Sequence, residues 1–118
     1  MTQHTKTVVA LAADLIFAAR IRAAADTVRV ILAKDVEDFL TKIRTEQPQL
    51  IVLDLDRRGL DVQHVVRQIK TLSDAHVLAY VSHVRADLIA AARDAGADRV
   101  MARGAFAKEM QAILRLEL

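Results

Sequence analysis

Polar residues that could act together in phosphate chemistry stand just after short, mainly apolar runs of this sequence. They are Asp14, Asp54, Ser82 and Arg103, with Asp56 close to Asp54. A carboxylate can act as a nucleophile toward a phosphoryl group, and carboxylate oxygens can hold Mg²⁺ beside it. A fixed cation can neutralise negative charge on the transferred group. These residue types therefore predict a site for phosphoryl groups, provided that the fold brings them together.

Each of these residues also has an ordinary structural interpretation. Asp14 and Ser82 could each cap the helix that follows, because their side-chain oxygens can accept hydrogen bonds from backbone N–H groups of the first turn. Asp56 could be a solvated loop acid, and Arg103 a surface cation over the edge of a sheet. Asp54 differs, because a carboxylate that directly ends an apolar run is costly to bury without a purpose. Asp54 is therefore predicted to be a site residue.

Five short runs rich in β-branched residues recur along the chain, and segments with helical apolar spacing lie between them. The predicted strands are Thr7–Leu11, Val28–Leu32, Leu50–Leu53, His76–Val81 and Arg99–Ala102. Helices are predicted at about Leu15–Ala25 and around the apolar stripes 36–43, 62–69, 88–95 and 106–114. Asp35 is placed to cap the second helix, and Gly96 to end the fourth in the left-handed conformation.

Strict alternation of five strand–helix units predicts an α/β fold, with an open parallel sheet and helices on both faces. Crossovers between parallel strands are right-handed, which leaves few topologies, and the flavodoxin-like order 2-1-3-4-5 is the commonest for five strands. In such sheets the carboxyl ends of the strands form one rim, and ligands bind there. The fold would bring the predicted site residues to that rim.

Length and composition restrict the architecture and the classes of function. The 118 residues are 53% hydrophobic and contain no linker-like tract, which predicts one domain over residues 1–118. The lack of cysteine favours a cytoplasmic setting, and no apolar stretch is long enough for a membrane span. A net charge of +2 and 3% aromatic residues argue against nucleic-acid binding. A local basic patch could still form from Arg57, Arg58, Arg67 and Lys70.

Two segments carry a resemblance to a known family. The segment 48–54, Pro-Gln-Leu-Ile-Val-Leu-Asp, resembles the third strand of the receiver domains of bacterial two-component response regulators. The segment 95–100, Ala-Gly-Ala-Asp-Arg-Val, resembles the receiver turn between the fourth helix and the fifth strand. The order of the predicted elements is similar to that of receivers over essentially the whole chain.

The resemblance implies a role for each candidate site residue. It implies that Asp54 is the phosphoacceptor and that Ser82 is the hydroxyl that senses the aspartyl phosphate. Arg103 stands where receivers carry an invariant lysine that pairs with the phosphoryl group. Asp14 matches one member of the acidic pair that binds Mg²⁺, so the metal-ligand candidates are Asp14, Asp54 and Asp56.

The chain departs from the receiver pattern at the same rim. At least one metal-binding acid is alanine, and a shift of one residue would leave both as Ala12 and Ala13. Arginine in place of lysine presents a longer, planar group with different geometric needs. Val100 occupies the position of the aromatic switch residue. Further departures are Gly104 and Arg58 in place of prolines and Val62 in place of a glycine. Together they predict an atypical, degenerate receiver with a weakened Mg²⁺ site.

Three functions are compatible with this interpretation. The first is a stand-alone signalling module, not an enzyme, that binds a protein partner such as a histidine kinase, with phosphoacceptor chemistry at Asp54 weakened or lost. The second is a phosphorylation-competent receiver in a phosphorelay. The third, a flavodoxin-like cofactor binder, is disfavoured because an acid stands in the loop 12–15 where flavin phosphate needs free amides. We expect neither flavin nor cobalamin.

In receivers the partner surface is usually formed by the fourth helix, the fifth strand and the fifth helix. The corresponding residues here make a mixed polar and apolar face, which is typical of transient interfaces and could also form a homodimer. They are Leu88, Arg93, Arg99, Lys108 and Gln111.

Overall fold

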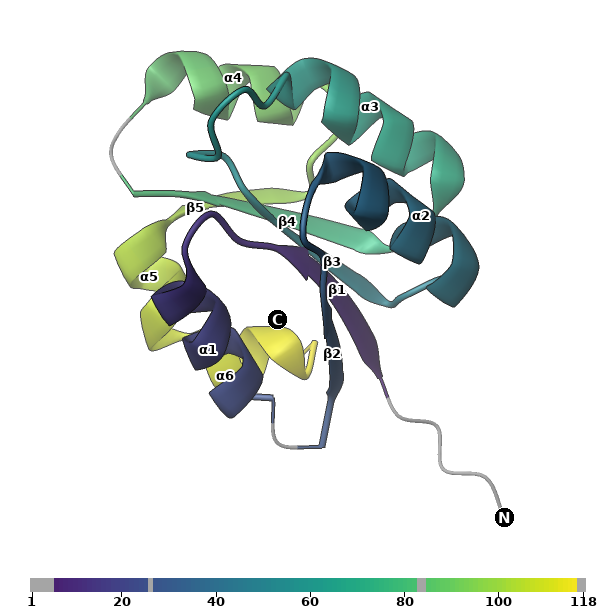
Figure 1. Ribbon diagram of the computed structural model, residues 1–118. Coiled ribbons are helices and arrows are strands. Elements are labelled where there is room, and N and C mark those ends of the chain that lie inside the picture. Colours follow the sequence, from purple (N-terminus) through teal and green to yellow (C-terminus); the bar gives the residue numbers. More distant parts are fainter. Residues whose placement is uncertain (1–5, 26, 83–84, 117–118) are drawn as a thin grey trace.

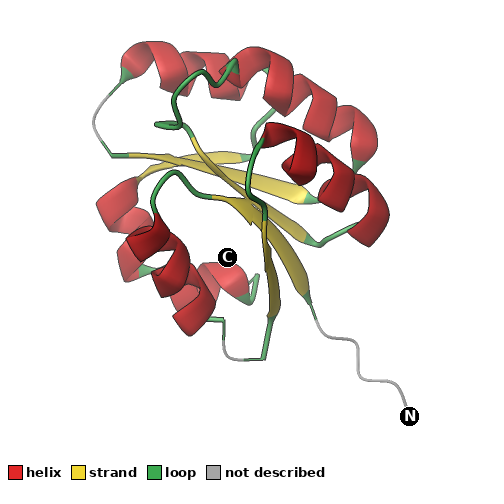
Figure 2. Ribbon diagram, viewed as in Figure 1, coloured by secondary structure: helices red, strands yellow, loops and turns green. Residues whose placement is uncertain are grey.

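The computed structural model describes residues 6–25, 27–82 and 85–116 and contains an alternating series of strands and helices (Figures 1 and 2). The strands are β1 (Thr7–Leu11), β2 (Arg29–Leu32), β3 (Leu50–Asp54), β4 (His76–Val81) and β5 (Arg99–Ala102). The helices are α1 (Leu15–Ala23), α2 (Val36–Glu46), α3 (Val62–Leu72), α4 (Ala86–Asp94), α5 (Arg103–Lys108) and α6 (Met110–Leu114). All strand pairs are parallel, in the order β2-β1-β3-β4-β5, which confirms the predicted fold class and strand order.

The sheet lies between two helical layers (Figure 2). α2, α3 and α4 pack on one face, and α1, α5 and α6 pack on the other. In β3, Ile51 and Leu53 belong to the first core, whereas Leu50 and Val52 belong to the second. A strand buried on both faces needs apolar side chains at every position, which explains the unbroken run before Asp54. No helix of the described residues is long and apolar enough to cross a membrane.

Element boundaries differ from the sequence-based expectation at several places. β3 continues through Asp54, β2 begins at Arg29, and α1 ends two residues early. The last helical stripe is divided at Glu109 into α5 and α6, although its apolar residues still share one core. Asp35 does cap α2, since its carboxylate accepts a hydrogen bond from the Asp38 N–H (2.7 Å).

The turn between α4 and β5 depends on Gly96 and Asp98. Gly96 has a φ of +112°, and a Cβ there would lie 3.3 Å from Cγ of Lys70, so glycine meets both a backbone and a packing requirement. The Asp98 carboxylate accepts the N–H of Val77 (2.8 Å) and the ammonium group of Lys70 (3.1 Å). Partial burial opposes ionisation, but the Val77 N–H and the Lys70 charge lower the pKa of Asp98 below 3.8. Asp98 thus joins the start of β5 to β4 and α3.

Replacing Asp98 by alanine should reduce the free energy of unfolding at neutral pH by about 1–3 kcal/mol, because the buried N–H of Val77 loses its acceptor. The lowered pKa gives the loss a defined pH dependence. The carboxylate contributes fully above pH 3.8, and its contribution disappears as the pH falls below that value. Denaturant unfolding at a series of pH values measures the difference.

Asp74→Ala is the matched control, since Asp74 is exposed in a loop and has no hydrogen bond within the described part of the chain. It should leave the free energy of unfolding nearly unchanged. An equal loss in both variants, or an Asp98→Ala loss that does not shrink in acid, would contradict the assigned role.

Candidate functional site

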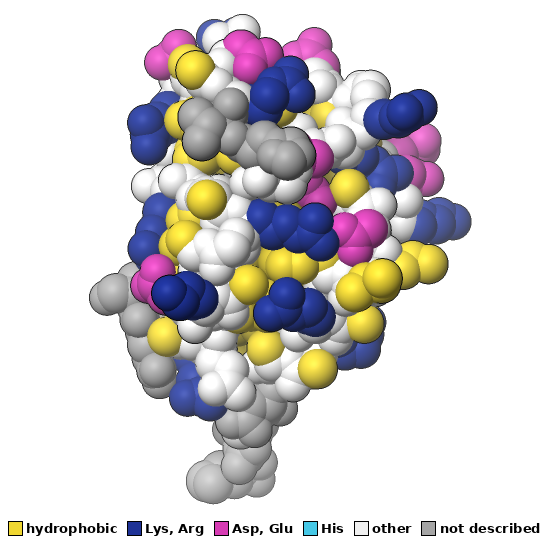
Figure 3. Space-filling model, turned by 90° about the vertical axis from the view of Figure 1, so that its left-hand side faces the viewer, with side chains coloured by type: hydrophobic (Ala, Val, Ile, Leu, Met, Phe, Trp, Pro, Cys, Tyr) yellow, Lys and Arg dark blue, Asp and Glu magenta, His cyan; other side chains and the backbone are white. Residues whose placement is uncertain are grey.

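The predicted site residues lie at the edge of the sheet where the strands end, which we call the rim. Asp54 is the last residue of β3, Arg103 is the first of α5, Asp14 precedes α1, and Ser82 follows β4. This edge is at the left in Figure 1 and faces the viewer in Figure 3, where basic side chains are spread across it with acidic ones among them.

Asp54 is a buried carboxylate with a hydrogen-bond donor on each oxygen. Its residue is 4% exposed. One oxygen, Oδ2, accepts the N–H of Ala13 (2.9 Å), and the other, Oδ1, accepts the N–H of Asp56 (2.9 Å). Such bonds offset the cost of burying a charge and fix the orientation of the group. Asp54 is therefore held between the loops that follow β1 and β3.

Arg103 makes its ion pair with Asp14. Nη2 of Arg103 lies 2.8 Å from Oδ2 of Asp14, and the guanidinium carbon lies 4.4 Å from the centre of the Phe17 ring. The other oxygen of Asp14 accepts the N–H of Phe17 (2.6 Å), so Asp14 also caps α1, as one sequence interpretation held. Arg103 is thus held by a charge and by an aromatic ring.

Ser82 and Asp56 form a second contact of the rim. The backbone N–H of Ser82 donates to Oδ2 of Asp56 (2.6 Å), and the residue Ser82 is exposed. The structure therefore brings Asp56 to Ser82 and to Asp54, while Asp14 and Arg103 pair with each other.

Tyr80 lies next to Asp54, although sequence reasoning did not assign it to the site. It lies directly opposite Asp54 in the β3–β4 pairing and is fully buried against the rings of Phe17 (4.9 Å) and Phe106 (5.1 Å). Its hydroxyl has no hydrogen-bond partner within the described residues. Burial, and then the Asp54 charge, raise the pKa of Tyr80 above its usual value. Side chains alternate between the two faces of a strand, and this alternation along the predicted strands would have placed Tyr80 and Asp54 on the same face of the sheet.

The donor groups at the rim do not fit the ligand set that Mg²⁺ requires. Ala12 and Ala13 follow β1, and the Asp14 carboxylate is engaged by Arg103 and by the cap of α1. Among the residues that the structure describes, no three His, Asp or Glu side chains are grouped so that they could hold a metal ion. Magnesium binds through oxygen ligands in a near-octahedral arrangement, which this set does not offer.

An open cavity of about 430 Å³ lies beside Asp54. It is lined by Ala13, Asp56, Arg57 and Arg58. Ala13 and Asp56 are the residues whose N–H groups bind Asp54, so the cavity adjoins the buried carboxylate. Its cations are guanidinium groups supplied by the loop after β3.

The first turn of α1 exposes two large apolar side chains next to the rim. Leu15 is 88% exposed and Ile16 is 77% exposed. Only Phe17 and Ile21 of this helix are fully buried. Because the rest of the helix is rich in alanine, its sequence has no clear apolar stripe that would separate buried from exposed positions. Sequence reasoning therefore missed the pair.

The residues of the predicted partner surface lie on α4, β5, α5 and α6. Leu88 packs against the core on the α2–α4 side of the sheet. Arg99 lies 3.7 Å from Glu109 in an ion pair that joins β5 to the α5–α6 junction. Lys108 and Gln111 line a groove against α1 instead. Arg93 is exposed on α4.

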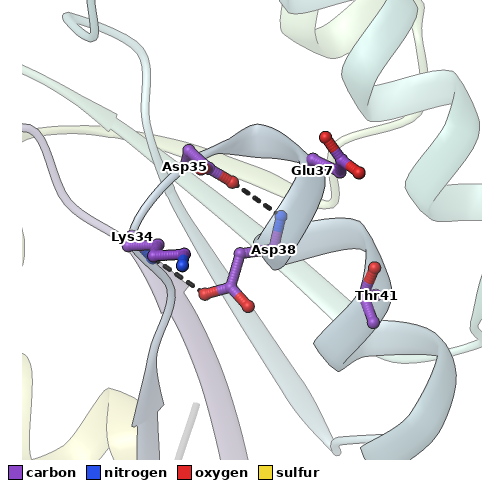
Figure 4. A pocket seen from close by; sticks show the side chains of 5 residues that line it. All are labelled: Lys34, Asp35, Glu37, Asp38 and Thr41. Carbon is purple, nitrogen blue, oxygen red and sulfur yellow. Dashed lines mark hydrogen bonds between the residues drawn. The ribbon is translucent and has the colours of Figure 1, made fainter.

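A second hollow lies at the start of α2, and its polar side chains include those that cap the helix (Figure 4). It is lined by Lys34, Asp35, Glu37, Asp38 and Thr41. The carboxylate of Asp38 accepts the N–H of Lys34 (3.0 Å) and the ammonium group of Lys42 (2.9 Å), and both lower its pKa. Asp35 in turn accepts the N–H of Asp38. These hydrogen bonds satisfy backbone N–H groups at the helix start and so stabilise it.

No protein-family model matches this chain, and no curated protein matches it. Its fold, in contrast, is shared with solved structures. A response regulator from Thermotoga maritima is 23% identical, with a TM-score of 0.80 over 96% of this chain and 97% of that chain. A CheY-like response regulator receiver domain protein from Methanospirillum hungatei is 13% identical, with a TM-score of 0.85 over 97% and 94%.

A third structure holds a modified aspartate. It is a response regulator protein from Burkholderia pseudomallei with a phosphorylated aspartic acid, calcium ion and citrate, 20% identical, with a TM-score of 0.77 over 95% of this chain and 74% of that chain. At these identities the likeness concerns the fold. The fold of this chain is therefore that of the CheY-like receiver domains of response regulators.

Proposed function

We propose that this chain is a receiver-type signalling module that acts by binding a protein partner, with phosphoryl acceptance at Asp54 weakened. One observation carries the proposal, namely the 2.8 Å ion pair between Arg103 and Asp14. In receivers, the cation at the position of Arg103 pairs with the phosphoryl group. Here the same cation is already neutralised by a neighbouring carboxylate.

The cost of freeing Arg103 explains why acceptance is weakened rather than abolished. Both partners are partly exposed, and an ion pair of this kind contributes about 0.2–1 kcal/mol. The Phe17 ring beneath the guanidinium adds about 0.5–1 kcal/mol. Together these contacts lower the equilibrium constant for moving Arg103 from Asp14 to a phosphoryl group by about tenfold. Asp54 itself stays positioned at the rim by its two backbone hydrogen bonds.

A second candidate function is a receiver that accepts phosphoryl groups efficiently within a phosphorelay. The placement of Asp54 favours it, because each oxygen accepts one backbone N–H from the described residues and the neighbouring cavity is open. The structure from Burkholderia pseudomallei, with its phosphorylated aspartic acid, also supports this chemistry for the fold. In both candidates the chain is a signalling module rather than an enzyme.

Replacing Asp14 by asparagine should raise the rate at which Asp54 is phosphorylated by acetyl phosphate, by about two- to fivefold. Asparagine remains a good helix cap but removes the charge that holds Arg103. In the reaction, an Asp54 oxygen attacks phosphorus and acetate leaves, so the protein gains one phosphoryl group. Intact-protein mass spectrometry over time measures the labelled fraction.

The controls are Asp54→Asn, which should not be labelled, and Asp74→Ala, which should be labelled like the wild type. Rapid, complete labelling of the wild type with no gain in Asp14→Asn would support the phosphorelay alternative and contradict the proposal.

The exposed pair Leu15 and Ile16 should form part of the partner contact, since adjacent exposed apolar side chains beside a site mark interaction surfaces. A photo-crosslinking amino acid at position 15 should yield a covalent adduct with the partner in cells. The double substitution Leu15→Asp/Ile16→Asp should weaken partner binding at least about tenfold, because burying each side chain contributes about 1.5–3 kcal/mol.

Position 19 is the matched control, because Ala19 is exposed on the same helix. Equal adduct formation at positions 15 and 19, or unchanged affinity in the double variant, would show that the partner binds elsewhere. Thermal unfolding of the variants verifies that the helix is intact.

A further inference from the structure

We infer that the cavity beside Asp54 is a metal-independent oxyanion site, in which arginine side chains hold a phosphate-type anion in the place of Mg²⁺. The inference deepens the proposed function and rests on it, because it concerns the same rim. It follows from the observation that, among the described residues, the rim of this chain lacks the acidic ligands for Mg²⁺ and carries arginines beside Asp54 instead.

The loop after β3 supplies two arginines to the lining of the cavity. Arg57 is partly buried, and its Nη2 donates to the carbonyl oxygen of Lys34 (3.1 Å), which holds the side chain near the start of α2. Arg58 is exposed and makes no hydrogen bond or ion pair within the described residues. One cation is therefore anchored, and the other has all its donors available to a ligand.

The charges of the rim balance without a metal ion. Its three carboxylates belong to Asp14, Asp54 and Asp56, and its three guanidinium groups to Arg57, Arg58 and Arg103. Asp14 is paired with Arg103, and the cavity itself is lined by one acid, Asp56, and by two arginines, Arg57 and Arg58. A divalent cation would meet like charges there, and its usual acidic ligands after β1 are replaced by alanine methyl groups.

The carboxylates of Asp54 and Asp56 each accept backbone N–H groups. Oδ2 of Asp56 accepts the N–H of Ser82, and both oxygens of Asp54 accept N–H groups. Guanidinium groups, in contrast, bind phosphate oxygens through parallel N–H bonds and remain charged at any physiological pH. The charged hydrogen-bond donors that line the cavity are the two arginines, and the ligand class that they fit is an oxyanion such as a phosphate or an acyl phosphate.

Titration with inorganic phosphate in the presence of EDTA tests the inference. NMR follows the backbone amide signals of Ala13 and Asp56, which adjoin the cavity and Asp54. The expected result is a saturable shift of both signals. Arg58→Gln and Arg57→Gln should each weaken phosphate binding at least about tenfold, because each removes charge-assisted hydrogen bonds to the anion.

The control Arg67→Gln removes an exposed arginine of α3 and the same net charge, so it should bind phosphate like the wild type. Magnesium chloride alone, at matched ionic strength, should leave both amide signals in place. The absence of a saturable phosphate shift, equal weakening by all three arginine variants, or a saturable Mg²⁺ shift at these amides would overturn the inference.

The proposed function can fail independently of this result. It is measured by covalent labelling of Asp54 and by partner crosslinking, whereas phosphate titration measures noncovalent binding to the unmodified chain. A protein that binds phosphate without metal but is labelled rapidly and completely would refute the proposed function and leave the anion site in place.

Discussion

A buried carboxylate needs hydrogen-bond donors, and this requirement organises the rim of the molecule. Asp54 ends a strand that is buried on both faces, so water is largely excluded from its side chain. The donors are supplied by Ala13 and Asp56, in the loops after two neighbouring strands. The two contacts draw these loops toward each other and form the wall of the adjoining cavity. Two of the residues that line the cavity, Ala13 and Asp56, are therefore the ones that hold Asp54.

Helix α1 connects this buried region to the molecular surface. Its cap, Asp14, holds Arg103, and Phe17 packs under the same guanidinium and against Tyr80. Leu15 and Ile16 lie between these residues in the sequence and point into solvent. A change in the position of Arg103 would therefore act directly on the turn that carries the exposed apolar pair. This arrangement links the proposed phosphoryl chemistry to the proposed partner contact within a few residues.

In the anion site that we infer, arginine side chains take the place of a metal ion. A divalent ion needs several acidic oxygens around it, whereas an arginine brings its own charge and directed donors. The chain has arginines at the cavity and alanines after β1. Under the inferred anion site, anion binding depends on side chains that are always charged rather than on metal concentration. The ion pair with Asp14 then sets how readily Arg103 can take part.

Sequence periodicity determined the elements and their order, because strand and helix patterns are local and the crossover rules leave few topologies. The unbroken apolar run before Asp54 identified the central strand and its terminal acid, and Asp35 and Gly96 marked helix boundaries that the structure contains. Small boundary shifts, such as the division of the last helix at Glu109, depend on local packing.

Only the tertiary structure decided how the rim residues pair. Arg103 and Asp14 are 89 positions apart, and whether that cation would turn to Asp14 or to Asp54 depends on side-chain geometry that no local pattern encodes. The same holds for the buried hydroxyl of Tyr80 opposite Asp54, and for the exposure of Leu15 and Ile16. Residue type and spacing identify which groups reach one edge of a sheet, whereas their contacts depend on the packing of several distant segments against one another.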